Sequence, residues 1–326
     1  MMNNTSEDTP HMTNIYPIPE PPTVSVHKLK SPRGAHLATR IWKPTSKPKC
    51  IILLVHGSGW HSGYYNAFAK RLNTNVGAFV MSYDQPGCGY SDREPGSPPN
   101  CTHIRSMDDL VEDVFAALAW TKLELAKLYQ DTALPVFLLG ESFGAPQVMK
   151  AAFYAAEQNI KLTGVISLAG LVRVGDSILP PAFVVNSICW LAKYYPKTIM
   201  RGVDTQSTFD DAFGDKKWAR TARADPKIVL QVAPTLSSVA TTLSAGDYIL
   251  ENAIHFPVPI LAIHARLDVR TKAEAIQEFC DKVGHKAVAI IVDSTTCHML
   301  LHDVPEVTNQ TIRDICEWVE RELKMK

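Results

Sequence analysis

Val136-Phe-Leu-Leu-Gly-Glu-Ser-Phe-Gly144 is the stretch that carries the strongest structural signal in this 326-residue chain. Its first four residues are apolar and predict a short buried strand, and a helical pattern over about 145–158 follows directly. Ser142 lies between the two in the pattern Gly-x-Ser-x-Gly, which is typical of a serine on a sharp turn from strand to helix. Small neighbours allow such a strained turn to close. An ordinary strand-to-helix turn is the alternative.

Apolar runs and helical patterns alternate on both sides of this turn. The predicted strands are 24–30 and 37–42, joined by a turn at Ser31-Pro-Arg-Gly34, and then 50–55, 78–83, 136–139, 162–168, 258–263 and 287–292. The predicted helices are 65–73, 106–129, 145–158, one that starts near Lys272, and 305–324. This alternation predicts an α/β fold whose mostly parallel central sheet is covered by helices on both faces.

The alternation stops between about 172 and 252, where the sequence predicts mostly helix and no buried strand. We interpret this block as a helical cap inserted between two halves of one sheet. It would lie above the C-terminal ends of the strands, where open α/β sheets bind their ligands. Residues 1–22 are polar and rich in proline, which predicts a disordered tail, and 23–326 are expected to form a single domain.

Composition narrows the functional classes. The 33 basic and 33 acidic residues cancel, so the basic excess of a nucleic-acid-binding protein is missing. The seven cysteines are irregularly spaced and include no CxxC pair, which favours reduced thiols over a disulfide framework or a zinc site. The sequence contains neither a recognisable secretory signal nor an apolar run of about 18 residues. We therefore expect a cytoplasmic protein without a metal or another cofactor.

A serine hydroxyl becomes a strong nucleophile only when a base takes its proton, and that base is usually a histidine oriented by a carboxylate. On a strand–turn–helix scaffold of this kind the chain order is serine, acid, histidine. Asp268 follows the predicted strand 258–263, and His298 follows 287–292. Both should therefore lie on loops at the same sheet edge as Ser142. Asp293 is the alternative acid, and His264 and His302 are the alternative bases.

Hydrolysis of an acyl group also requires backbone N–H groups that stabilise an oxyanion. The N–H of Phe143, the residue after the serine, should supply one of them. The glycine-rich loop His56-Gly-Ser-Gly59 follows the strand 50–55, and the Ser58 N–H is the expected second donor. We expect His56 to hold this loop rather than to exchange protons. The loop lacks the spacing of a phosphate-binding motif.

Five segments of the chain resemble, in the same order, the monoacylglycerol lipase and lysophospholipase group of α/β-hydrolases. They are His56-Gly-Ser-Gly-Trp-His-Ser-Gly-Tyr64, Asp84-Gln-Pro-Gly-Cys-Gly-Tyr-Ser-Asp92, Gly140-Glu-Ser-Phe-Gly144, His264-Ala-Arg-Leu-Asp-Val-Arg-Thr271 and Cys297-His-Met-Leu-Leu-His-Asp-Val-Pro-Glu306. The resemblance covers about 25–322 and is weakest across the inserted block. It implies an α/β-hydrolase fold.

The resemblance also implies roles for individual residues. Ser142, Asp268 and His298 match the catalytic triad of the group, and the N–H groups of Ser58 and Phe143 match its oxyanion hole. The cap at 172–252 would line an acyl-binding pocket and could rest on a membrane. The implied activity is hydrolysis of the ester bond of a monoacylglycerol or lysophospholipid through an acyl-enzyme, with no cofactor.

The sequence departs from the group at several positions without losing a catalytic group. Glu141 and Gln85 each replace a common histidine, Ala145-Pro146 replaces a pair of small residues, and Ala265 replaces a glycine. Pro146 is compatible with the first turn of a helix, where its missing N–H matters little. These departures leave the substrate preference open.

The cap supplies a separate indication of a lipid substrate. Apolar and aromatic residues are dense between 179 and 195, namely Leu179, Ala182, Phe183, Val184, Val185, Ile188, Trp190, Leu191, Tyr194 and Tyr195. A helix that faces the acyl chain or touches a membrane would explain them, and so would packing of the cap against the core. Both explanations can hold for different faces of one helix.

An aminopeptidase, thioesterase or acyltransferase would use the same three catalytic groups. A non-catalytic lipid-binding module is a further alternative, although such a module has no need of all three.

Overall fold

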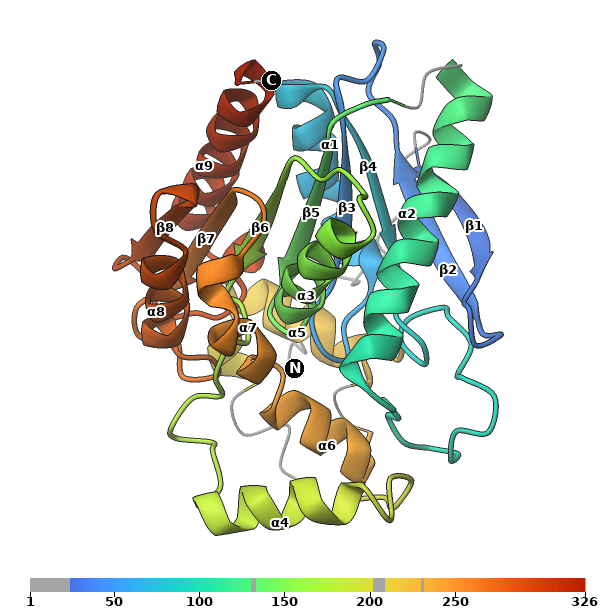
Figure 1. Ribbon diagram of the computed structural model, residues 1–326, viewed down its shortest axis with the longest axis vertical. Helices are drawn as coiled ribbons and strands as arrows, with labels where there is room; N and C mark the ends of the chain where they lie inside the picture. The colour runs from blue at the N-terminus through green and yellow to red at the C-terminus, as the bar shows by residue number, and fades with distance from the viewer. Residues whose placement is uncertain (1–23, 130–132, 202–208, 230–231, 326) are drawn as a thin grey trace, which may run out of the picture.

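A computed structural model describes residues 24–129, 133–201, 209–229 and 232–325 of the protein. Within these ranges an eight-stranded sheet forms the centre of the molecule (Figure 1). In chain order its strands are β1 (Val24–Lys30), β2 (His36–Trp42), β3 (Cys50–Val55), β4 (Ala78–Tyr83), β5 (Val136–Glu141), β6 (Gly164–Leu168), β7 (Ile260–Ala265) and β8 (Ala287–Val292). Across the sheet the order is β1-β2-β4-β3-β5-β6-β7-β8. The first two strands are antiparallel to their neighbours and the other six are parallel, so the predicted α/β fold is confirmed.

The central strands are wholly apolar because side chains from both of their faces enter a hydrophobic core. In β3, Ile51, Leu53 and Val55 enter one core, while Ile52 and Leu54 enter the other. The first core is covered by α2 (Met107–Tyr129), α3 (Gly144–Glu157) and α8 (Ala273–Val283), which lie in front of the sheet in Figure 1. The second is covered by α1 (Asn66–Val76) and α9 (Pro305–Lys324).

The block between β6 and β7 contains α4 (Ala182–Ala192), α5 (Lys216–Ala224), α6 (Leu236–Leu243) and α7 (Asp247–Glu251). It is less helical than the sequence predicted, because loops join these short helices. Prolines account for several of the boundaries: α4 begins directly after Pro181, α5 ends before Asp225-Pro226, and α6 begins after Pro234-Thr235.

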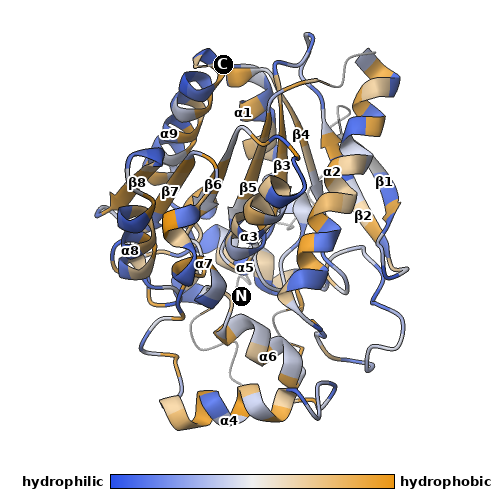
Figure 2. Ribbon diagram, viewed as in Figure 1, coloured by the Kyte–Doolittle hydropathy of each residue, from blue (hydrophilic) through white to orange (hydrophobic). Residues whose placement is uncertain are grey.

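The C-terminal end of this block lies against the layer of helices that covers the sheet. Residues of α7 belong to the core that contains α3 and α8, so this helix extends the layer over the sheet. By contrast, α4 contacts α6 and lies far from the sheet at the lower edge of Figure 1. Apolar residues run along much of α4 in Figure 2. No helix in the described ranges is both long and apolar enough to cross a membrane. The predicted tail at 1–22 lies outside the described residues.

Candidate active site

Ser142 occupies the turn between β5 and α3 with a backbone φ of 53°, in the left-handed region that residues with side chains rarely adopt. The flanking glycines allow this turn to pack closely. A Cβ atom on Gly144 would lie 2.2 Å from the Val55 carbonyl oxygen, and one on Gly140 would lie 2.4 Å from the Gly144 carbonyl oxygen. The Ser142 N–H donates to the Leu168 carbonyl at 2.8 Å. The neighbouring strands therefore hold the serine in its strained conformation.

Ser142, His298 and Asp268 form a continuous hydrogen-bonded chain. The Ser142 Oγ atom is 2.8 Å from His298 Nε2, and His298 Nδ1 is 2.6 Å from Asp268 Oδ2. Asp268 follows β7 and His298 follows β8, so the loops after two neighbouring parallel strands deliver the two partners. The structure thus brings together the three residues that the sequence analysis selected.

Asp268 is held as a carboxylate. Its Oδ1 atom accepts from the N–H groups of Arg270 and Thr271 at 2.8 and 3.3 Å, and its Oδ2 atom accepts from the Thr271 hydroxyl at 2.8 Å. Burial opposes ionisation, but the charge of His298 and hydrogen bonds from His264 and His298 outweigh it and keep the pKa of Asp268 below its ordinary value. The sequence analysis missed Thr271, although a hydroxyl three residues after an aspartate often joins such a local turn.

The alternative acid and bases occupy other environments. Asp293 is exposed and pairs with Arg266 on the protein surface. His302 is buried against the Tyr64 carbonyl, 3.2 Å from it, and burial lowers the pKa of His302 to about 4. The Nε2 atom of His264 lies 3.4 Å from Asp268 Oδ2, so this histidine contacts the acid rather than the serine.

Two peptide N–H groups beside Ser142 have fixed orientations. The Ser142 carbonyl accepts from the N–H groups of Ala145 and Leu171 at 3.1 and 3.0 Å. Because a peptide unit is planar, these bonds also fix the direction of the Phe143 N–H. The Gly57 carbonyl is 2.7 Å from His56 Nδ1, which fixes the Ser58 N–H in the same way.

The protonation of His56 follows from its contacts. Its Nε2 atom accepts from the Gln85 N–H at 2.9 Å, so the ring proton is on Nδ1 and is donated to the Gly57 carbonyl. Burial is the main cause that lowers the pKa of His56, which keeps the ring neutral. His56 therefore supports the loop, as the sequence analysis expected, and takes no part in the contacts of Ser142.

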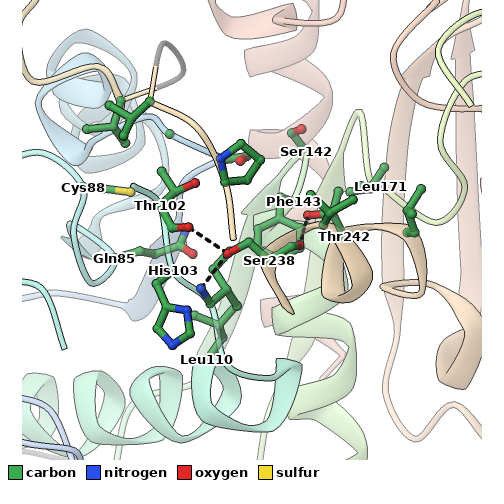
Figure 3. Close-up of a pocket in the computed structure, with 18 of the residues that line it drawn as sticks. Gln85, Cys88, Thr102, His103, Leu110, Ser142, Phe143, Leu171, Ser238 and Thr242 are labelled. Atoms are coloured by element: carbon green, nitrogen blue, oxygen red, sulfur yellow. Dashed lines mark hydrogen bonds between the residues drawn. The ribbon is translucent and has the colours of Figure 1, made fainter. Parts of the chain in front are cut away.

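A cavity of about 320 Å³ opens on Ser142, with Ser58 and His298 in its wall. Figure 3 shows Ser142 and Phe143 among the residues that line it. Most of the remaining wall is apolar and comes from the loop between β4 and α2, the start of α2, the cap and the loop after β6. The apolar residues include Leu110, Leu171, Val174, Ile178, Val229, Val232, Val239 and Leu243. Thr102, His103, Ser238 and Thr242 add polar groups, and Figure 3 shows Ser238 and Thr102 joined by a hydrogen bond. The site therefore combines a nucleophile with an amphipathic pocket.

Metal ligands do not cluster in the part of the chain that the structure describes. Within those ranges, no three or more histidine, cysteine, aspartate or glutamate side chains are arranged to hold a metal ion.

A mostly parallel sheet with a serine on the turn after β5, an acid after β7 and a histidine after β8 defines an α/β-hydrolase. The chain belongs to the serine aminopeptidase S33 family, whose model matches residues 46–305. This family assignment agrees with the resemblance seen in the sequence.

Individual relatives are named as monoglyceride lipases. The chain is 28% identical over 262 residues to a putative monoglyceride lipase of Schizosaccharomyces pombe, covering 77% of this chain but only 62% of that protein. It is 24% identical over 288 residues to the monoglyceride lipase of Homo sapiens, covering 88% of each.

Among solved structures, a soluble variant of monoglyceride lipase from Saccharomyces cerevisiae with a substrate analog matches with a TM-score of 0.74. The two are 18% identical, and the match covers 91% of this chain and 94% of the other. This structural similarity supports the fold. With the family match, the protein is placed among the serine α/β-hydrolases, and the relatives that it resembles include proteins named monoglyceride lipase.

Proposed function

We propose that this protein hydrolyses the carboxylic ester bond of a lipid, with monoacylglycerol as the preferred substrate class. The observation that carries the proposal is the Asp268–His298–Ser142 chain at the wall of a mostly apolar cavity. The similarity of the sequence to proteins named monoglyceride lipase supports the same conclusion.

In the proposed reaction, Ser142 Oγ attacks the ester carbonyl carbon while His298 Nε2 takes the hydroxyl proton. Asp268 stabilises the imidazolium that forms, and the N–H groups of Ser58 and Phe143 bind the oxyanion. The carbon–oxygen bond to the alcohol then breaks, and His298 gives its proton to the departing alkoxide. Water repeats the sequence on the acyl-enzyme and releases the fatty acid, so the enzyme returns to its starting state.

The cavity favours a neutral head group over a charged one. The apolar wall suits an acyl chain, and the hydroxyl and imidazole groups near Thr102 and His103 suit the hydroxyls of glycerol. The wall contains four charged residues, and each has a partner: Arg105 binds Asp109, Glu94 binds Arg33, and Arg270 is also engaged within the protein. A lysophospholipid, whose head group carries a phosphate, is therefore the second choice.

We also propose that α4 and the residues after it rest on a membrane surface while the enzyme acts on lipid. Phe183 is 73% exposed and Trp190 57% exposed, and Tyr194 and Tyr195 are similarly open to solvent. Aromatic side chains of this kind insert into the boundary between lipid head groups and acyl chains. We place the protein on the cytoplasmic side of membranes, which suits its seven free cysteines.

A substrate panel tests the proposal. Purified protein is incubated with monoacylglycerols, lysophosphatidylcholine, an acyl thioester, an aminoacyl p-nitroanilide and short p-nitrophenyl esters. We expect fastest release from monoacylglycerol, with no release by Ser142→Ala. Faster cleavage of the anilide would instead establish the aminopeptidase activity that the family description suggests. Tight binding of lipid without turnover of any compound would support a non-catalytic module.

A further inference from the structure

Two glutamine side chains, Gln85 and Gln147, connect the two backbone segments assigned to the oxyanion hole. Gln147 Nε2 donates to Gln85 Oε1 at 2.9 Å and to the Phe143 carbonyl at 3.1 Å. Gln85 Nε2 in turn donates to the His56 carbonyl at 2.6 Å. Hydrogen bonds thus run without interruption from the residue after the nucleophile to the loop that carries Ser58.

We propose that this Gln85–Gln147 bridge holds the two oxyanion-hole segments at the separation that the reaction needs. Both glutamines are then positioning residues, and the inference rests on the proposed ester hydrolysis at Ser142. Neither side chain touches Ser142 through any hydrogen bond that the structure records. Gln85 also lines the cavity, whereas Gln147 does not, so the effect of Gln147 in particular would pass through the backbone of the two segments.

Each contact in the bridge dictates the orientation of the next group. The Gln147 amide nitrogen is within hydrogen-bond distance of two oxygen atoms, so its NH₂ end must face them. Gln85 must then present Oε1 to Gln147, which leaves its own NH₂ end for the His56 carbonyl. The Gln85 backbone N–H also sets the His56 ring proton on Nδ1, where it binds the Gly57 carbonyl. The bridge therefore extends to the peptide unit that contains the Ser58 N–H.

Core packing alone does not account for a glutamine at position 147. The side chain is fully buried, and among the described residues its Oε1 atom has no hydrogen-bond partner. A buried amide oxygen without a partner costs stability, and an aliphatic side chain of similar size would avoid that cost. Gln85 is also one of the positions at which the sequence departs from the group it resembles. The two amides are consistent with a role in placing backbone groups.

The test compares wild type with Gln147→Leu, Gln85→Leu and the double variant. The readout is the second-order rate constant for labelling of Ser142 by a fluorophosphonate, since this reaction also builds negative charge on an oxygen in the oxyanion hole. Loss of a complete oxyanion donor typically lowers rates about 10²- to 10³-fold. Displacement should cost less, so we expect a fall of about 10- to 100-fold in each single variant.

Two further measurements distinguish a change in the position of the oxyanion-hole groups from a general loss of folding or substrate binding. The kcat for ester hydrolysis should fall with the labelling rate. In Gln147→Leu, whose side chain lies outside the cavity wall, KM and the affinity for a non-cleavable alkyl ether of glycerol should change less than about threefold. The double variant should lose no more than the worse single variant, because both substitutions break one bridge. Gln147→Met and Gln85→Met repeat the test if a leucine variant does not fold.

Thr121→Val is the matched control. It removes a buried hydroxyl that binds the Ala117 carbonyl at 2.7 Å within α2, outside the cavity wall, and should lower Tm without changing the labelling rate. Wild-type labelling rates in the glutamine variants, or losses that multiply in the double variant, would overturn the positioning role. If wild type is labelled at Ser142 but cleaves no lipid ester, the proposed function fails while the labelling rates still decide the role of the bridge.

Discussion

His298 Nε2 lies 2.8 Å from Ser142 Oγ, although 156 positions separate the two residues in the chain. The contact arises because β5 and β8 run parallel in one sheet and end at the same edge. The histidine ring also bonds Asp268 through its other nitrogen, so its orientation toward the serine is fixed before a substrate arrives. This arrangement accounts for how a serine hydroxyl could act as a nucleophile near neutral pH.

Replacement of Asp268 by asparagine should nearly abolish turnover. The amide cannot stabilise an imidazolium and favours the wrong ring tautomer, so kcat for a p-nitrophenyl ester should fall about 10³- to 10⁴-fold. Asp293→Asn is the control, because Asp293 is an exposed acid paired with Arg266. It should keep wild-type kcat. Equal losses in the two variants would refute the assignment of Asp268 as the acid.

The sequence was sufficient to predict the sheet, its order of elements and the three residues that meet at Ser142. Each of these depends on local patterns: apolar runs mark the buried strands, Ser142 directly follows one of them, and Asp268 and His298 lie on the loops after two others. Chain order then places the loops at one edge of the sheet. The sequence does not distinguish α7 from the helices of the cap, because its residues are apolar whether they cover the sheet or a cap.

Other contacts of the site depend on pairs of distant residues that no local motif marks. Asp225 and His61 are 164 positions apart, and Gln85 and Gln147 are 62 apart. A lone aspartate before Pro226, or a glutamine within a helix, has many explanations in the sequence alone. Only the three-dimensional arrangement shows that each one faces a polar partner.

Glu141 should make the protein less stable as the pH rises. Burial raises the pKa of this carboxyl group from 4.5 to about 7, although a hydrogen bond from Tyr65 opposes the shift. Between these values the folded state keeps a proton that the unfolded state releases, so the free energy of unfolding falls with increasing pH. Glu141→Gln lacks this proton. Its stability relative to wild type should increase by about 2.5 kcal/mol between pH 5 and pH 8.

Urea denaturation of both proteins at several pH values measures this difference. The comparison with wild type removes the contribution of other groups, such as Asp113, whose pKa burial also raises to about 7. Parallel stability curves for the two proteins across this range would show that Glu141 is ionised at neutral pH, contrary to the prediction.

Asp225 should couple the cap to the loop that carries Ser58. Its Oδ2 atom is 2.7 Å from His61 Nε2 and accepts from the Tyr64 hydroxyl at 3.1 Å. Nearby, the Val229 N–H donates to the Gly59 carbonyl at 3.0 Å. Burial lowers the pKa of His61 to about 4, so the neutral ring donates its Nε2 proton to the carboxylate.

Asp225→Ala leaves these buried donors without an acceptor and should destabilise the protein by about 2 kcal/mol. It should also raise KM for monoacylglycerol several-fold, because Val229 and Gly59 both line the cavity. Asp225→Asn keeps an acceptor oxygen and should restore most of both properties. Thermal unfolding and steady-state kinetics check the two effects. An unchanged KM in Asp225→Ala would show that the contacts of Asp225 do not affect substrate binding.

Exposed aromatic residues of α4 should determine membrane binding. Phe183→Ser combined with Trp190→Ser removes two large apolar groups, each worth about 1.5–3 kcal/mol when buried, so binding to phosphatidylcholine–phosphatidylglycerol vesicles should weaken at least about 10-fold. Hydrolysis of p-nitrophenyl acetate in solution should not change. Leu123→Ser, at an equally exposed position on α2, is the control and should sediment with vesicles as wild type does. Equal vesicle binding by all three proteins would exclude the exposed aromatic residues of α4 as the membrane-binding surface.

Hydrolysis of monoacylglycerol by wild type and Ser142→Ala, followed by mass spectrometry of the trapped acyl-enzyme, tests the central claim most directly. We expect wild type to release fatty acid and glycerol and to carry the acyl group on the peptide that contains Ser142. The variant should lose at least about 10⁴-fold in kcat, because no other group can replace the nucleophile. Turnover by Ser142→Ala within tenfold of wild type, or an acyl group on a different residue, would contradict the account.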